Sequence, residues 1–223
     1  RKNEGAFKVA ISLSGVGIEQ LERYAPQVMD LLQELNETNC CEFLAEPYSH
    51  GLSSLSPKGE QYFRDETKRQ AERINNLFGQ KPKIFRNSSM IYSDEIGALV
   101  ADMGFKGVLT EGAKHVLGWK SPHYLYHCAL NPKLKVFTRD FKLSDDISLR
   151  FSDPSWVPYP LMADTYMDWI AQSPEEEGIF NIFMELSALG IYQPLSSHIL
   201  EFIKSLPACA KKRNVQFATP SEI

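Results

Sequence analysis

The sequence lacks the features that would place the protein in a membrane or on nucleic acid. No apolar run approaches the roughly 20 residues that a membrane-spanning helix needs, and the first residues contain no apolar signal-peptide core. Lysine and arginine are scattered and the net charge is −4, so no basic stripe is available for a polyanion. We therefore expect neither a membrane nor a nucleic acid as a partner.

Cysteine is scarce, and its spacing does not fit the common structural zinc sites. The four cysteines include no CxxC pair. Cys40 and Cys41 stand at the entry of an apolar run, where one of them is expected to face inward as a small hydrophobic residue. We expect reduced thiols in a cytoplasmic protein, with no metal and no cofactor.

Linkers, low-complexity tracts and internal repeats are also missing, so the 223 residues are expected to form one domain. Hydrophobic residues make up 43% of the chain and charged residues 23%, a balance typical of a globular protein with a sizeable core. The oligomeric state is not indicated by any pattern in the sequence.

Short apolar runs alternate with longer segments of helical periodicity. Strands are expected at residues 7–13, 41–45, 83–86, 107–110, 135–138, 178–184 and 215–218. Helices are expected at 18–35, 57–78, 93–103, 144–151, 161–171 and 195–206, with Ser93 as an N-cap and Gly104 as a helix stop. This alternation predicts a mostly parallel sheet in a barrel or a doubly wound arrangement.

Polar residues collect just after the expected strands. In a parallel barrel the carboxyl ends of the strands meet on one face, and sites form there. These residues are Glu46 with His50, Arg86 with Asn87, Ser88 and Ser89, Glu111, Asp140, Glu185 with Ser187, and Ser221 with Glu222, with Tyr48, Tyr92, Trp119 and Tyr192 as aromatic neighbours. Carboxylates, an arginine and aromatic faces suit sugar rings, which offer C–H faces and many hydroxyls. The alternative for any single carboxylate is that it caps the following helix.

Several segments resemble conserved regions of the α-amylases of glycoside hydrolase family 57. Residues 85–112 (FRNSSMIYSDEIGALVADMGFKGVLTEG) are similar to a region that begins F-R-N-T-E-L-I-Y, and residues 41–52 (CEFLAEPYSHGL) to the preceding region. NIFMELSALG falls where the family has N-I-F-M-D-Y-E-T-F-G, and ATPSEI resembles the fifth region. The resemblance covers nearly the whole chain and implies an incomplete (β/α)7 barrel. The family's first region, which ends in His-Gln-Pro, is absent, so we expect the first barrel strand to be missing.

The same resemblance implies that the catalytic residues have been replaced. The family nucleophile, a glutamate, is Ser89 here, and the family acid/base, an aspartate, is Glu185. A second glutamate of the family pattern is Ser187, and a nearby histidine is Tyr192. The residues expected to contact an α-glucan or maltooligosaccharide are Glu46, His50, Arg86, Tyr92, Glu111, Trp119, Ser187, Tyr192 and Glu222.

The replacement at Ser89 is chemically severe. A serine hydroxyl is neutral and needs an adjacent base to attack. The serine glycoside that it would form is an ordinary acetal, from which serine leaves poorly. Glu185 keeps a carboxyl group but carries it one methylene further out, and a misplacement of about 1 Å can reduce a rate roughly 10²-fold. We expect a silent or very slow retaining hydrolase that binds or regulates α-glucans.

Two other activities remain open on the sequence. An active hydrolase or glucanotransferase could use Glu185 with Glu111 or Glu46, at the separation of about 6.5–9.5 Å that an inverting mechanism needs. A metal-dependent polysaccharide deacetylase could use His123 and His127, whose i, i+4 spacing can hold zinc on a helix. The aromatic alternation after Ser121-Pro122 favours an extended segment there, which argues against such a zinc pair.

Overall fold

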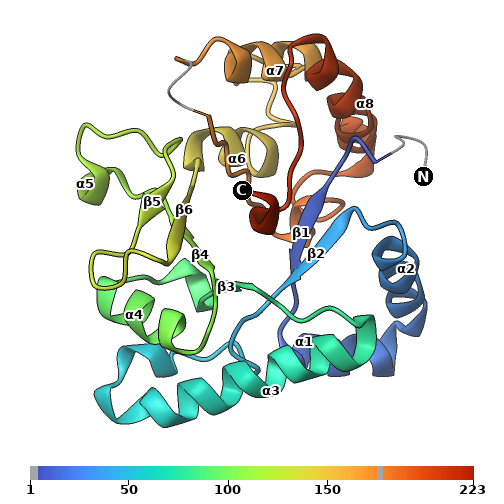
Figure 1. Cartoon of the computed structure of the whole chain (residues 1–223). Helices are drawn as coiled ribbons and strands as arrows, with labels where there is room; N and C mark the ends of the chain where they lie inside the picture. Colours follow the sequence, from blue (N-terminus) through green and yellow to red (C-terminus); the bar gives the residue numbers. More distant parts are fainter. Residues whose placement is uncertain (1–4, 175–177) are drawn as a thin grey trace. The chain divides into compact units, whose positions relative to one another are not determined.

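The computed structural model describes residues 5–174 and 178–223 as a mixed α/β fold (Figure 1). Its contacts divide the chain into two compact units. Unit one comprises Arg1–Thr110, Leu125–Phe137 and Ala218–Ile223, and unit two comprises Glu111–Tyr124 and Thr138–Phe217. The single domain expected from the sequence stays a prediction.

The strands form two open sheets. In unit one, β1 (Val9–Ser12) pairs with β2 (Cys41–Leu44) in parallel. The second sheet has the order β3-β4-β6-β5, with β3 at Ile84–Arg86, β4 at Gly107–Glu111, β6 at Lys135–Arg139 and β5 at Tyr126–His127. A parallel bridge between Ala45 and Phe85 links the end of β2 to β3, so these two strands are neighbours. β3 and β4 pair in parallel, and β5 runs antiparallel to β6.

Four α-helices accompany the strands of unit one. They are α1 (Gly15–Tyr24), α2 (Pro26–Asn36), α3 (Glu60–Phe78) and α4 (Asp94–Asp102), with single 3-10 turns at Ser53–Leu55, Pro57–Gly59, Ser88–Met90 and Pro220–Glu222. In Figure 1, α2 lies beside β2 and the long α3 passes α1. Phe78 at the end of α3 stacks on Phe43 of β2, with 3.9 Å between ring centroids, and so fixes this helix on the sheet.

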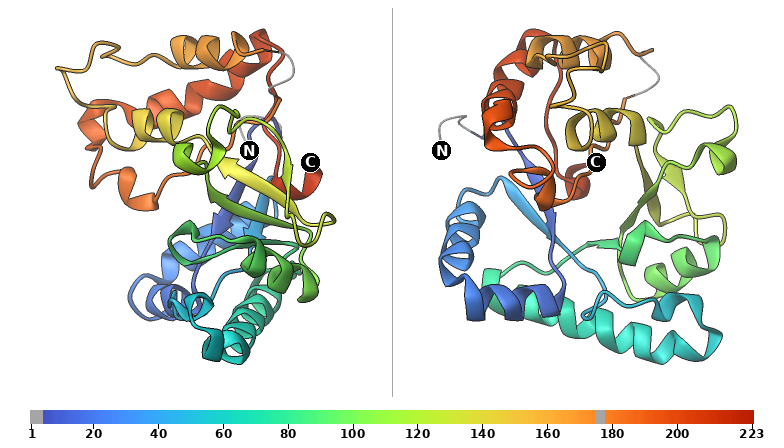
Figure 2. Two further views of the ribbon diagram at one scale, coloured as in Figure 1. Left: turned by 90° about the vertical axis from the view of Figure 1, so that its left-hand side faces the viewer. Right: turned by 180° about the vertical axis from the view of Figure 1, so that it is seen from behind.

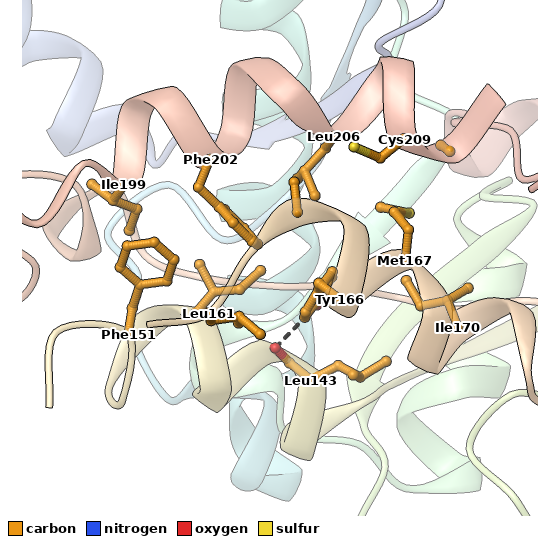
Figure 3. Packing of buried hydrophobic residues seen from close by; sticks show 13 residues of the cluster. Leu143, Phe151, Leu161, Tyr166, Met167, Ile170, Ile199, Phe202, Leu206 and Cys209 are labelled. Atoms are coloured by element: carbon orange, nitrogen blue, oxygen red, sulfur yellow. Dashed lines mark hydrogen bonds between the residues drawn. The ribbon is translucent and has the colours of Figure 1, made fainter. Parts of the chain in front are cut away.

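Unit two is mainly helical. It contains α5 (Lys114–Leu117), α6 (Phe141–Ser148), α7 (Ala163–Ala171) and α8 (Ile199–Lys212), with 3-10 turns at Leu186–Ala188 and Leu195–Ser197. The views of Figure 2 show α7 and α8 lying side by side. Their facing side chains form the core in Figure 3, where the hydroxyl of Tyr166 donates a hydrogen bond of 3.1 Å to the carbonyl of Leu143.

Five of the expected strands are confirmed, with boundaries that differ by at most two residues: β1, β2, β3, β4 and β6. The helix after Ser93 is confirmed as well, because the Ser93 hydroxyl accepts a hydrogen bond from the amide of Ile96. Gly104 follows this helix at a φ of 94°, a conformation that glycine adopts without strain.

The expected helix at 18–35 is wrong as a single element. It divides at Ala25, whose φ of −147° and ψ of 55° lie outside the helical region. Pro26 explains the break, because proline disfavours helical geometry in the preceding residue and begins a new helix well. The helix expected at 144–151 begins three residues earlier, at Phe141, because Asp140 caps it.

The strands expected at 178–184 and 215–218 are wrong. In the first run only Asn181 forms a bridge, to Arg139, and residues 215–218 are irregular. Phe180, Ile182, Val215 and Phe217 instead pack against the helical core of unit two. In both runs the apolar residues indicated correctly that the segment packs against the core. Burial alone does not show that a segment pairs as a strand.

Phe202 tests the packing of unit two, since its ring lies against Phe151 and Tyr166 and is only 6% exposed. We expect Phe202→Ala to lower the free energy of unfolding by about 3–5 kcal/mol in urea titrations, through lost burial and a cavity. Leu200→Ala on the same helix, at a side chain 37% exposed, is the control and should change stability by less than about 1 kcal/mol. Equal losses for the two variants would contradict this assignment of the core.

Candidate functional site

A buried ion pair joins the ends of three neighbouring strands in unit one. Arg86, the last residue of β3, donates through Nη1 to Glu46 Oε2 at 3.0 Å. Ser12, the last residue of β1, donates to the same oxygen at 2.7 Å. Glu46 follows β2 and is 2% exposed, so the ion pair is largely removed from water. His50 lies with its Nδ1 at 3.7 Å from that carboxylate and is itself exposed.

The structure thus brings together three predicted site residues, Glu46, Arg86 and His50. Gln70 of α3 supports them from behind, because its side-chain oxygen accepts from the amide of Glu46 and its Nε2 donates to the carbonyl of Leu13. Buried charges require such partners, since an unpaired charge in a protein interior is very unfavourable. The sequence did not predict Ser12 as a partner, although it lies at a strand end.

Ser89 lies in a tight turn directly after β3. The side-chain oxygen of Asn87 accepts from the amide of Ser88, and the Asn87 amide group donates to Ser54 and to the carbonyl of Ile91. Ser89 has a φ of 51° and Met90 a φ of 55°, both in the left-handed region. For residues with a side chain this conformation is unfavourable by about 1–2 kcal/mol each. The turn therefore holds the exposed Ser89 side chain in a fixed and strained position.

Two further predicted site residues of unit one serve local contacts. Tyr92 donates to Asp94 Oδ1 at 3.0 Å, and burial together with hydrogen bonds raises the pKa of its hydroxyl. Glu222 accepts from the amide of Thr219 in a capping box and also pairs with Lys8, whose hydrogen bond lowers the pKa of Glu222. For Glu222 the capping alternative therefore holds.

In unit two, Glu185 lies on an exposed turn with two other predicted residues. The Ser187 hydroxyl donates to Glu185 Oε2 at 3.2 Å, and the amide of Tyr192 donates to the carbonyl of Ser187 at 3.0 Å. Tyr192 is 56% exposed, so its ring is open to solvent. In this segment Ser187 therefore contacts both Glu185 and Tyr192.

Arg139 organises a second cluster in unit two that the sequence did not predict. Its guanidinium group binds both carboxylate oxygens of Glu111, at 3.2 and 3.3 Å, and Asp145 Oδ1 at 2.6 Å. Arg139 directly follows the strand expected at 135–138, but the candidate predicted at that strand end is Asp140. Glu111 is thereby engaged by an arginine instead of standing free.

His123 and Asp140 form a half-buried pair in unit two, with His123 Nε2 at 2.7 Å from Asp140 Oδ2. Asp140 Oδ1 accepts from the amide of Leu143, so this residue also caps α6. Burial alone would raise the pKa of Asp140, but the hydrogen bond from His123 and the cap outweigh it and lower the pKa. The pair that the deacetylase alternative required is not on a helix: His123 lies in a turn and His127 in β5.

Trp119 is 92% exposed and follows α5 in unit two, so its ring is almost fully accessible. Across the described residues, no group of three His, Cys, Asp or Glu side chains is arranged to hold a metal ion. In the same part of the chain, no helix combines the length and apolarity that crossing a membrane requires.

The sequence as a whole matches a known protein family. A family model described as glycosyl hydrolase family 57 matches residues 1–223. The chain belongs to this family. Among curated proteins, a Methanocaldococcus jannaschii protein described as "Putative alpha-amylase" is 37% identical over 222 residues. The match covers 99% of this chain and 46% of that protein, so the chain spans about half the length of this relative.

Two solved structures share the fold. The 4-alpha-glucanotransferase from Thermococcus litoralis aligns with a TM-score of 0.76 at 17% identity, over 99% of this chain and 34% of its own. The GH57-type branching enzyme from Pyrococcus horikoshii aligns with a TM-score of 0.65 at 12% identity, over 92% of this chain and 49% of its own. At these identities the likeness concerns the fold.

The buried pair gives the first prediction of the site. We expect Arg86→Met to destabilise the protein by about 3–5 kcal/mol, because Glu46 is left charged and buried without its partner. Adding Glu46→Gln should restore part of the loss in urea unfolding. Arg64→Met, at the more open pair with Asp102, is the control and should cost less than about 1 kcal/mol. A loss no larger than that of the control would contradict the role assigned to the buried pair.

Asp140 gives a prediction for pH. Because its pKa is lower in the folded protein, it contributes stability that is present above the unfolded value of about 3.9 and is lost as the pH falls through the folded value. Asp140→Asn keeps a capping side chain but removes the charge. We expect the stability difference between the native protein and this variant to be largest near pH 7 and to shrink below about pH 4. Urea unfolding from pH 7 to pH 3 measures it, and a constant difference would refute this assignment.

Proposed function

We propose that this family 57 chain binds or processes α-glucans and that its retaining chemistry is lost or very slow. The observation that carries the proposal is Ser89. Ser89 lies in the exposed, strained turn after β3, next to the Arg86–Glu46 pair. The resemblance of residues 85–92 to the family pattern F-R-N-T-E-L-I-Y assigns Ser89 the position of the family nucleophile. The relatives whose names refer to an alpha-amylase, a glucanotransferase and a branching enzyme support α-glucan as the ligand class.

We further propose that the parallel strands belong to an incomplete (β/α)7 barrel. The ladder runs without interruption from β1 through β2, the Ala45–Phe85 bridge and β3 to β4 and β6. Within unit two, the Arg139–Asn181 bridge adds one more parallel partner at the end of β6. The sequence of adjacent parallel strands supports a barrel-like arc, in which polar residues after each strand form the mouth.

Ser89 changes the chemistry because retaining hydrolysis needs a carboxylate that attacks the anomeric carbon and later leaves it. A hydroxyl lacks the negative charge that balances an oxocarbenium-like transition state. Activation of the Ser89 hydroxyl would need a base within hydrogen-bond reach. His50 is the candidate base, and its charged partner in the structure is Glu46. Ser89 therefore supports loss of the covalent step.

Glu185 is the remaining carboxyl at a family catalytic position. It is exposed and accepts a hydrogen bond from Ser187. Its longer side chain displaces the carboxyl group relative to the family aspartate, and such displacements of about 1 Å reduce rates roughly 10²-fold. We assign Glu185 a position of acid/base type with reduced function.

The alternative carboxylate pairs are less favourable. Glu46 is buried and bound to Arg86 and Ser12, and Glu111 is held by both oxygens on Arg139. A carboxylate committed to an arginine is poorly placed to take part in proton transfer with a sugar. These contacts argue against Glu46 or Glu111 as the partner of Glu185 in an active hydrolase.

We also infer the setting in which the chain acts. All four cysteines are free, and Cys41, Cys128 and Cys209 are buried, which suits a reducing compartment such as the cytoplasm. Burial raises the pKa of the Cys41 thiol to about 12, so this thiol is inert toward oxidation. The expected ligand is a maltooligosaccharide, with no cofactor assigned.

Restoring the family pair tests the proposal. We expect the double variant Ser89→Glu with Glu185→Asp to gain hydrolysis or transfer on maltooligosaccharides, by roughly 10²-fold or more over the native chain. Ser89→Gln with Glu185→Asp is the matched control, because glutamine has the size of glutamate without its charge. Product release is measured by chromatography. Equal activity of the native chain, the control and the double variant would reject Ser89 as the cause of the loss.

A further inference from the structure

A hollow in unit two has the size and the lining of a separate ligand site. Its volume is about 530 Å³, within the range of about 300–1,000 Å³ that small-molecule sites occupy. Trp156, Trp169 and Phe180 form its apolar lining, and Asp146, Arg150 and Gln172 are among the polar side chains. Neither Ser89 nor Glu185 belongs to this lining.

The two tryptophans present differently oriented faces. Their ring centroids lie 6.4 Å apart with an interplanar angle of 77°, and both side chains are half-buried. Phe180 adds a third ring, which lies 4.1 Å from the imidazole of His123 and is tilted by 38° to it. Aromatic faces at nearly a right angle suit a ring that presents C–H groups on its faces and hydroxyls at its rim.

The polar groups of the hollow retain hydrogen-bonding capacity. The side chain of Asp146 is 3% exposed, and within the described residues its carboxylate is bonded only by Arg150, through Oδ1. Its Oδ2 is therefore an acceptor for a ligand. The side chains of Gln172 and Ser173 and the two indole N–H groups form no hydrogen bond to any described residue. Donors and acceptors that other side chains do not occupy, gathered in one concave surface, are typical of a site that recognises a polar ligand.

The charges of the hollow balance. Lys142 and Arg150 supply two positive charges, and Asp146 and Asp140 supply two negative charges, with His123 bonded to Asp140. An anionic or cationic ligand would meet a group of its own sign at close range, which is unfavourable. A neutral ligand with several hydroxyls matches these groups better.

We propose that this hollow binds a glucose unit of an α-glucan, as a second carbohydrate site separate from the positions of Ser89 and Glu185. The inference rests on the proposed function for the choice of sugar. Trp156 and Trp169 supply the faces against which the ring packs. The Asp146 carboxylate accepts hydrogen bonds from its hydroxyls, and the Gln172 side-chain amide donates hydrogen bonds to them.

Tryptophan fluorescence gives a direct test with maltotriose as the probe. The chain has three tryptophans, so Trp119→Phe leaves emission only from Trp156 and Trp169. We expect maltotriose to change this emission with a saturable curve. In the same background, Asp146→Asn should weaken the apparent affinity at least 10-fold, and Gln172→Ala should weaken it several-fold. Val157→Ala is the matched control, because Val157 adjoins Trp156 but is 95% exposed and outside the lining.

The outcomes separate this site from the candidate catalytic residues. The Asp146→Asn and Gln172→Ala proteins are first checked for native melting temperature and circular dichroism, so that a loss of binding is not a loss of folding. Ser89→Ala with Glu185→Gln should leave the fluorescence titration unchanged. If that variant abolishes the signal while Gln172→Ala and Asp146→Asn do not, the hollow is not the site. Heat of maltotriose binding in calorimetry without any fluorescence change would also reject the hollow while preserving glucan binding by the chain.

Discussion

The buried ion pair between Glu46 and Arg86 is the constraint on which the candidate site in unit one depends. It joins β3 to the segment after β2, and Ser12 extends the connection to β1. Two charges at this depth are tolerated only with their partners in place, so the strand ends are fixed relative to one another. The turn that carries Ser89 starts directly after Arg86, and its position therefore follows from the pair. Serine in a turn that is supported in this way is the basis of the proposed loss of covalent chemistry.

Much of unit one could be predicted from the sequence because local patterns there agree with the final contacts. Apolar β-rich runs became β1, β2, β3, β4 and β6, and Ser93 capped its helix as its hydroxyl suggested. Unit two was harder to predict. Residues 178–184 are as apolar as a buried strand, yet they pack on helices and share one bridge with Arg139. Periodicity and composition report that a residue is buried, and they do not report which element buries it.

The site was predictable where chemistry follows directly from strand ends, and not where it depends on contacts between distant segments. Glu46, Arg86 and His50 came together as expected. The ion pair of Arg139 with Glu111 joins residues 28 positions apart, and the pair of His123 with Asp140 joins residues 17 positions apart. No local sequence pattern indicates either contact. The hollow of Trp156 and Trp169 likewise forms only when a loop and a helix pack together. Such contacts could not be predicted from the sequence, because tertiary packing determines which residues meet.

The central claim is that a family 57 framework persists here without the covalent chemistry of a retaining hydrolase. The most direct measurement is prolonged incubation of the purified native chain, at high concentration, with a maltooligosaccharide, followed by mass spectrometry of the products. The account predicts no hydrolysis or transfer above the rate without protein, and no glycosyl group attached to the chain. Turnover that disappears in Glu185→Gln, or a sugar adduct on Ser89, would contradict it.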